Sequence, residues 1–263
     1  MGNLFDLKKN IEMLKEIALS AGILLRKKFS ENLVIGFKGS NNLVTDADLE
    51  SETMIVEFLR KNFPSHGIIA EEGSKSESQN AEYFLIDPLD GTTNFAHSYP
   101  CFAVSIGLME NEEPVCGVVY DPMRDEMFSA FQGGGALLNG NPLKVSGTAE
   151  VGKSLLVTGF AYDSGKFNNL PHFSRIVLEA QGVRRDGSAA LDICHVAAGR
   201  FDGFWEMGLY PWDTAAGAVI LSESGGRISR FDLSPWHPAQ RELLATNGKI
   251  HAELSGLLTC DGK

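Results

Sequence analysis

Two short apolar runs in the first third of the chain end abruptly in acidic residues. The run HGIIA stops at Glu71, and the run YFLI stops at Asp87, with Asp90 three residues further on. Apolar runs of this length predict buried strands. If the strand ends converge, several carboxylates share one pocket, where like charges raise each other's pKa values unless a cation compensates them.

Each acid also has an ordinary explanation when it is taken alone. Asp87-Pro88 is typical of a strand end, Asp90-Gly91 of a turn, and Asp213 of a helix N-cap. Their shared position at element ends favours a common site. Because these ligands are all oxygen donors, with no His or Cys close to them in sequence, a hard ion such as Mg²⁺ is favoured over Zn²⁺.

The segment that follows Asp90 predicts a partner for such ions. Gly91-Thr92-Thr93-Asn94 resembles the start of a short helix, whose free backbone N–H groups form an anion site. Carboxylate-bound Mg²⁺ beside a helix start suits a phosphate group and can activate a water molecule. We therefore expect phosphomonoester hydrolysis, with Thr92 orienting or activating the water and Glu71 as its proton-accepting neighbour.

Apolar periodicity divides the chain into two regions. Helices are expected over residues 7–29 and 48–63, the second with Leu49 on its apolar face, followed by antiparallel strands and a hairpin at Asn139-Gly140. After about residue 150, short strands alternate with helices, at 170–180, 189–198 and 214–224. We expect an α+β fold with an N-terminal α+β half, 1–150, that carries most metal ligands, and a C-terminal α/β half, 151–263, that completes the metal and substrate site.

Charge and cysteine content restrict the partners and the compartment. The chain carries 23 Lys plus Arg against 34 Asp plus Glu, a net charge of −11, which disfavours nucleic acid and anionic membranes as partners. Four scattered cysteines form no disulfide framework, and no segment resembles a signal peptide or a membrane span. A cytoplasmic protein is expected.

Several motifs together resemble the inositol monophosphatase family of Mg²⁺-dependent, lithium-sensitive phosphatases. They are IDPLDGTTNF (86–95), WDTAAG (212–217) followed by ESGG, the AEEG strand end and LVTDAD near the front, while GSAALDICHVAAGRFDGFWE (187–206) is similar to the bacterial branch. The resemblance implies a layered α/β sandwich of two packed halves, usually a homodimer. It also implies a phosphoric monoester hydrolase that acts on a small phosphorylated polyol or sugar.

The resemblance further implies a ligand set for two or three Mg²⁺ ions. Glu71, Asp87 and the backbone carbonyl of Leu89 would hold the first ion. Asp87, Asp90 and Asp213 would hold the second, and a third, weaker ion would lie near Glu71. Asp90 and Asp213 would also meet the leaving-group oxygen of the substrate.

Further residues are implied in binding and closure. Gly91 and Thr92 would bind the phosphate through their amides, and Thr92 with Glu71 would activate the attacking water. The polyol hydroxyls would meet Glu206 and the turn Gly187-Ser188-Ala189. Lys38 and Asp48 match a front loop that closes over the site, in which Asp46 is interpreted as a solvated helix-start residue.

Substrate choice stays open among relatives that share this machinery. Glu206 offers an acceptor for a neutral polyol, which favours myo-inositol 1-phosphate. Fructose 1,6-bisphosphate is the leading alternative if Arg184, Arg185 and Arg200 form a cationic pocket, and nucleotide 3′-phosphates, NADP and histidinol phosphate remain open. A non-catalytic protein-binding or metal-sensing module is disfavoured because no acid of the set is missing.

Overall fold

The structure is a computed structural model that describes residues 4–30, 35–37, 43–79, 81–163 and 165–260. The helices are α1 (Leu4–Lys28), α2 (Asp46–Asn62), α3 (Thr92–Ala96), α4 (Leu170–Glu179), α5 (Ala189–Ala197), α6 (Pro211–Glu223) and α7 (His251–Thr259). The strands of the first region are β1 (Ile35–Phe37), β2 (Leu43–Thr45), β3 (Gly67–Ala70), β4 (Lys75–Ser76), β5 (Glu82–Asp90), β6 (Ala103–Glu110), β7 (Glu113–Asp121), β8 (Glu126–Phe131), β9 (Gly135–Leu138) and β10 (Asn141–Pro142). Those of the second are β11 (Leu155–Thr158), β12 (Gly182–Arg184), β13 (Gly203–Met207), β14 (Arg227–Ser229) and β15 (Glu242–Thr246).

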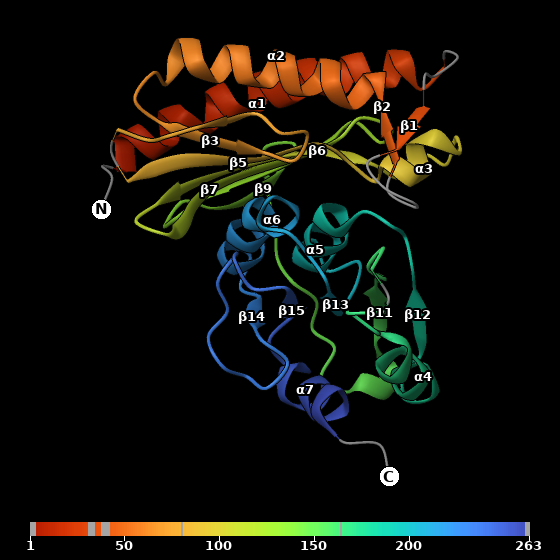
Figure 1. The fold of residues 1–263 in the computed structure, drawn as a ribbon. Coiled ribbons are helices and arrows are strands. Elements are labelled where there is room, and N and C mark those ends of the chain that lie inside the picture. Colours follow the sequence, from red (N-terminus) through yellow and green to blue (C-terminus); the bar gives the residue numbers. More distant parts are fainter. Residues whose placement is uncertain (1–3, 31–34, 38–42, 80, 164, 261–263) are drawn as a thin grey trace.

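Helices and sheets alternate in layers (Figure 1). An eight-stranded sheet has the order β10-β9-β8-β7-β6-β5-β3-β4, and a five-stranded sheet has the order β12-β11-β13-β15-β14. Helices α1 and α2 cover the outer face of the larger sheet, α5 and α6 lie between the two sheets, and α4 and α7 cover the outer face of the smaller one. The predicted layered α+β fold is confirmed. A boundary near residue 150 stays a prediction, although it falls between the last strand of one sheet and the first of the other.

The two opening helices occur where the apolar pattern predicted them, with one error. In α2, Val56 and Leu59 are buried against the sheet, but Leu49 is 51% exposed. The first turn of α2 directs Ala47 to the core and carries a capping box formed by Thr45 and Asp48. Leu49 therefore faces away from the core, and the prediction that it faces the core is wrong.

The second region contains elements beyond those predicted. Helices α4, α5 and α6 agree with the predicted segments, although α6 begins earlier, at Pro211, because Tyr210 and Asp213 form its capping box. Strands β14 and β15 and helix α7, which follow Gly225-Gly226, were not predicted from the apolar pattern. Strand β15 lies inside the smaller sheet, between the central strand β13 and the edge strand β14, so the sheet depends on it. Among the described residues, no helix is long and apolar enough to cross a membrane.

Candidate active site

The site begins where β3 and β5 end side by side. These strands are parallel neighbours, and their register pairs Ala70 with Ile86. Glu71 directly follows the last residue of β3, Asp87 is the next residue of β5, and the Glu71 amide donates to the Ile86 carbonyl at 3.1 Å. Because the carboxyl ends of parallel strands meet at one sheet edge, the two acids lie together, as the sequence predicted.

An irregularity in β5 brings Asp90 to the same side as Asp87. Residues three apart on a regular strand point to opposite faces. Between Asp87 and Asp90 the register against β6 shifts, because three steps on β5 match the two steps from Ser105 to Ala103. Ser51 of α2 donates to the Pro88 carbonyl at 2.8 Å inside this bulge. The bulge is thus held from behind, and both carboxylates line one pocket.

The start of α5 holds the Asp90 carboxylate in place. Its Oδ2 accepts from the Ser188 hydroxyl at 2.6 Å and from the Ala190 amide at 2.7 Å. Ser188 is also the N-cap of α5. The segment 187–189, which resemblance connects with the substrate, therefore also positions a proposed metal ligand.

Helix α6 delivers Asp213 from its first turn. The Asp213 Oδ2 accepts from the Tyr210 amide at 2.8 Å, which closes the capping box. The ordinary interpretation of Asp213 as an N-cap is therefore close to correct, since it serves the helix start from the third helical position. The other carboxylate oxygen is not used by this contact, and Asp213 lines the same pocket.

These elements enclose a pocket of about 150 Å³. It is lined by Glu71, Asp87, Leu89, Asp90, Gly91, Thr92, Gly159, Ala161, Tyr162, Asp163, Arg185, Gly187, Ser188, Ala189, Glu206, Gly208, Leu209, Tyr210, Asp213 and Arg241. The predicted metal, phosphate and substrate residues therefore come together, apart from Asp48, which lies behind Thr92, and Lys38, which lies outside the described residues.

Electrostatics in the pocket follow from burial and like charge. Burial first, and then Glu71, Asp90 and Asp213, raise the pKa of Asp87 well above its ordinary value. Burial raises the pKa of Asp90 to about 6 and, with Glu71 and Asp90, raises the pKa of Asp213 as well. Carboxylates gathered in this way stay protonated or bind a cation.

The donor set fits hard divalent ions. Besides these carboxylates it includes the Leu89 carbonyl, so every donor is an oxygen. Among the described residues, the only three His, Cys, Asp or Glu side chains whose ligand atoms all lie within 4.8 Å of one another are Asp186, Asp192 and His195, on α5 and the turn before it. The described pocket carboxylates contain no such group of three, so binding of an ion there would draw them closer together.

Thr92 contacts a partner that the sequence did not assign to it. Its hydroxyl lies 3.0 Å from Asp48 Oδ1 and 3.1 Å from the Leu89 carbonyl. The other Asp48 oxygen accepts from the Thr45 amide at 2.7 Å and from the Thr45 hydroxyl at 2.6 Å. Asp48 is 1% exposed, and burial raises its pKa. Asp48 therefore lies in the first turn of α2 and not in the front loop, and its buried carboxylate is an acceptor for Thr92.

The second region supplies the other wall of the pocket. Glu206 of β13 lies over Gly159, where any Cβ would overlap its carboxylate. Burial raises the pKa of Glu206 to about 8. Tyr162, from the loop after β11, reaches α3, where its hydroxyl lies 2.9 Å from that of Thr93. No sequence signal marks Tyr162, because only the folded arrangement brings this loop to the pocket.

The cationic residues differ from those predicted for a bisphosphate pocket. Arg185 lines the pocket, but Arg184 does not, and Arg200 is held by Glu126 through two hydrogen bonds. Arg241, which the sequence analysis missed, lines the pocket instead, with its guanidinium 4.0 Å from the ring centre of Tyr210. It comes from the segment before β15, a part of the chain without a predicted element.

Comparisons with known proteins agree with this arrangement. The inositol monophosphatase family profile matches residues 6–260. An inositol-1-monophosphatase from Synechocystis is 49% identical over 96% of this chain and 90% of its own length. A protein named Nus factor SuhB from Pseudomonas aeruginosa is 42% identical over 90% of this chain and 91% of its own.

A solved structure agrees over the same extent of chain. An inositol monophosphatase from Anabaena superposes with a TM-score of 0.89 at 47% identity, covering 96% of both chains. Sequence motifs, fold and overall similarity therefore lead to one assignment. The chain belongs to the inositol monophosphatase family, a family of metal-dependent phosphatases.

Proposed function

We propose that the protein hydrolyses myo-inositol 1-phosphate to inositol and inorganic phosphate in the presence of Mg²⁺. The observation that carries this proposal is the single pocket that joins the oxygen ligands at the ends of β3 and β5 to Glu206 on the opposite wall. The similarity to proteins named inositol-1-monophosphatase supports the same substrate. A phosphorylated polyol would use both walls, because its phosphate needs the oxygen-bound metal ions and its hydroxyls need an acceptor such as Glu206.

The proposed ligands are those that the family resemblance implies. Glu71, Asp87 and the Leu89 carbonyl would hold one Mg²⁺, and Asp87, Asp90 and Asp213 would hold another. When bound, Mg²⁺ would supply charge neutralisation at the phosphoryl oxygens and would lower the pKa of a coordinated water. The backbone N–H groups of Gly91 and Thr92 lie at the start of α3, where a helix leaves its amides without an intrahelical acceptor, so they suit the phosphate oxygens.

The chain's own residues would move the proton and hold the alcohol. Thr92 donates to the buried Asp48, so a hydroxyl lone pair is left free to accept a hydrogen bond from the attacking water, which would orient it while its proton passes to Glu71. Glu71 lines the same pocket and is the proposed final acceptor. Glu206 would accept hydrogen bonds from substrate hydroxyls, while Ser188 and the Ala190 amide keep Asp90 in its rotamer.

Fructose 1,6-bisphosphate is a second candidate because two arginines line the pocket. Arg185 and Arg241 offer planar cationic groups that suit a second phosphate. Arg241 already donates to the Gly208 carbonyl at 2.5 Å and stacks on Tyr210, so part of its capacity is used. The monophosphate remains the preferred substrate for this reason.

We also infer a homodimer and a cytoplasmic location. The dimer is typical of the family. The four cysteines, Cys101, Cys116, Cys194 and Cys260, are all free, which suits a reducing compartment.

Phosphate release from the two substrates tests the proposal. We expect release from myo-inositol 1-phosphate that requires Mg²⁺, stops with EDTA and is inhibited by Li⁺. Asp90→Asn should lower kcat on the order of 100-fold or more, whereas the matched change Asp232→Asn, at an exposed loop residue, should leave it unchanged. Faster release from fructose 1,6-bisphosphate would make that compound the assigned substrate. No phosphate release from either compound would favour a nucleotide phosphate as substrate or a non-catalytic role.

A further inference from the structure

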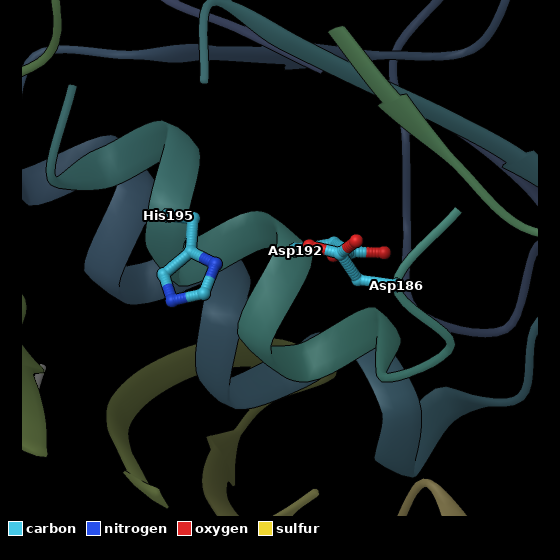
Figure 2. A group of neighbouring side chains, drawn as sticks. All are labelled: Asp186, Asp192 and His195. Carbon is cyan, nitrogen blue, oxygen red and sulfur yellow. The ribbon is translucent and has the colours of Figure 1, made fainter. Parts of the chain in front are cut away.

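A second group of potential metal ligands lies outside the catalytic pocket. Asp192 and His195 project from α5, and Asp186 comes from the turn before it (Figure 2). Their ligand atoms all lie within 4.8 Å of one another. None of the three residues lines the pocket that holds Asp90 and Glu206.

Two members of the group are buried with unsatisfied polar atoms. Asp192 is 1% exposed and His195 is 6% exposed. Within the described part of the chain, Asp192 Oδ1 and His195 Nε2 are both buried without a hydrogen-bond partner. A carboxyl group withdrawn from water with an unsatisfied oxygen is costly in its charged form, so without a cation it holds a proton, which a bound ion would displace.

The two arginines that act on His195 are engaged with other carboxylates, while Arg185 lies near Asp192. Arg124 donates to Asp121 at 2.8 Å, and Arg200 donates to both oxygens of Glu126. The rings of Phe128 and Phe201 pack against the imidazole of His195 at centroid distances of 6.1 and 5.6 Å. These contacts fix the ring in position, with Nδ1 on the side of the two carboxylates and the partnerless Nε2 on the far side (Figure 2).

The geometry of the helix brings the ligands together. Asp192 and His195 are three residues apart on α5, so they are neighbours on one helix face. Gly187 has a φ of 85°, a backbone conformation that favours glycine, and it turns the chain between Asp186 and the helix start. Figure 2 shows the two carboxylates meeting beside α5, with the imidazole one turn further along.

We propose that Asp186, Asp192 and His195 bind one divalent transition-metal ion, with Zn²⁺ as the best match. Imidazole nitrogen and carboxylate oxygen are both donors that Zn²⁺ accepts, and water would be the fourth ligand of a tetrahedral site. This set is softer than the all-oxygen set of the pocket, so the two sites select different ions.

The ion would connect the turn before α5 to the helix itself. Ser188 and Ala190, which hold the Asp90 carboxylate, lie between Asp186 and Asp192 in the sequence. The Asp186 carbonyl also accepts from Asn94 Nδ2 of α3 at 2.8 Å. A metal here would therefore brace the segment that positions Asp90, without touching the substrate.

Zinc binding to the full-length protein in excess Mg²⁺ tests the proposal. Competition with a chelating dye should show one Zn²⁺ per chain. Asp192→Asn and His195→Gln should each weaken that binding at least about tenfold. His172→Gln is the matched control, because the Nδ1 of His172 is also buried without a described partner, but the residue lies on α4, beyond the smaller sheet. This control should bind Zn²⁺ as the wild type does.

Diffraction from wild-type crystals grown with Zn²⁺ provides a test that needs no variant. An anomalous peak at the zinc edge between the three side chains is expected. Equal zinc affinity in all variants would overturn the proposal, as would a peak confined to the pocket near Glu71 or a basic side chain of a second copy seated on Asp192. Each measurement reads zinc directly, so failure of the proposed phosphatase activity would not affect it.

Discussion

The hydroxyl of Thr92 has one proton and two acceptors within reach, and the choice between them sets what Thr92 can do. Asp48 Oδ1 is at 3.0 Å and carries charge, whereas the Leu89 carbonyl at 3.1 Å is neutral. Charge-assisted hydrogen bonds are the stronger ones, so donation to Asp48 is favoured. The lone pairs of Thr92 are then directed at the pocket.

Asp48→Asn tests this residue pair. Since an amide is a weaker acceptor than a carboxylate, we expect kcat to fall about 100-fold and the free energy of unfolding to fall by about 1 kcal/mol through the weakened cap. In a Thr92→Ala background the same change should have little further effect on kcat, because the two residues act as a unit. Steady-state kinetics on the four proteins measures the coupling.

The neighbouring acid Asp46 provides the control for this cycle. It also lies in the first turn of α2, but it pairs with Lys28 at 2.8 Å, towards solvent. Asp46→Asn should change both kcat and stability little, because exposed ion pairs contribute less than about 1 kcal/mol. Additive losses of kcat from Asp48→Asn and Thr92→Ala would show that Asp48 acts independently of Thr92.

At the scale of elements, the site depends on how closely α6 approaches the larger sheet. A Cβ at Gly107 would lie 3.0 Å from the Cβ of Ala215, and one at Gly117 would overlap the backbone of Ala216. These small residues let α6 lie directly on β6 and β7, which sets the height of Asp213 in its first turn above the ends of β3 and β5.

Gly117→Ala should therefore affect both stability and activity. We expect the overlap to cost about 1–3 kcal/mol and to move the start of α6, which lowers kcat. Gly256→Ala is the matched control, because Gly256 lies within α7 with no atom within 4 Å of the added Cβ. That change should stabilise the protein by about 0.5–1 kcal/mol with unchanged kcat. Equal Tm values for the two variants in thermal unfolding would contradict this account of the α6 contact.

Which site residues could be predicted from the sequence also depends on how the elements pack. Strand ends marked by Glu71, Asp87 and Asp90 are local signals, so the convergence of these acids could be predicted from the sequence. The bulge that turns Asp90 to the side of Asp87 is set by the register against β6, and the sequence shows no register. Arg241 was missed for the same reason, since only the pairing of β15 with β13 brings it to the pocket.

At the scale of the whole molecule, two sets of buried groups change the free energy of unfolding in opposite directions as the pH rises. Burial lowers the pKa values of His195 and His251 to about 4, so these residues are neutral in the native state, and the stability that this gives is lost as the pH falls below 6.5. Burial raises the pKa of Glu206 to about 8, so the native state retains its proton, and that stability is lost as the pH rises. Above pH 6.5 the histidines are neutral in both the folded and the unfolded state, so they add nothing to the pH dependence of stability. The carboxyl groups alone then decide how the free energy of unfolding changes with pH.

The free energy of unfolding in EDTA should therefore fall between pH 6.5 and 8, by about 1.5 kcal/mol from Glu206 alone. Urea unfolding at each pH measures it, and Glu206→Gln should flatten this part of the profile because its amide does not titrate. Mg²⁺ should raise Tm more at pH 8 than at pH 6.5, since protons compete with the ion for carboxylates whose pKa values are raised. If the wild-type profile matches that of Glu206→Gln over this interval, Glu206 is already ionised in the native protein. Glu206 could then accept hydrogen bonds from a neutral polyol without first releasing a proton.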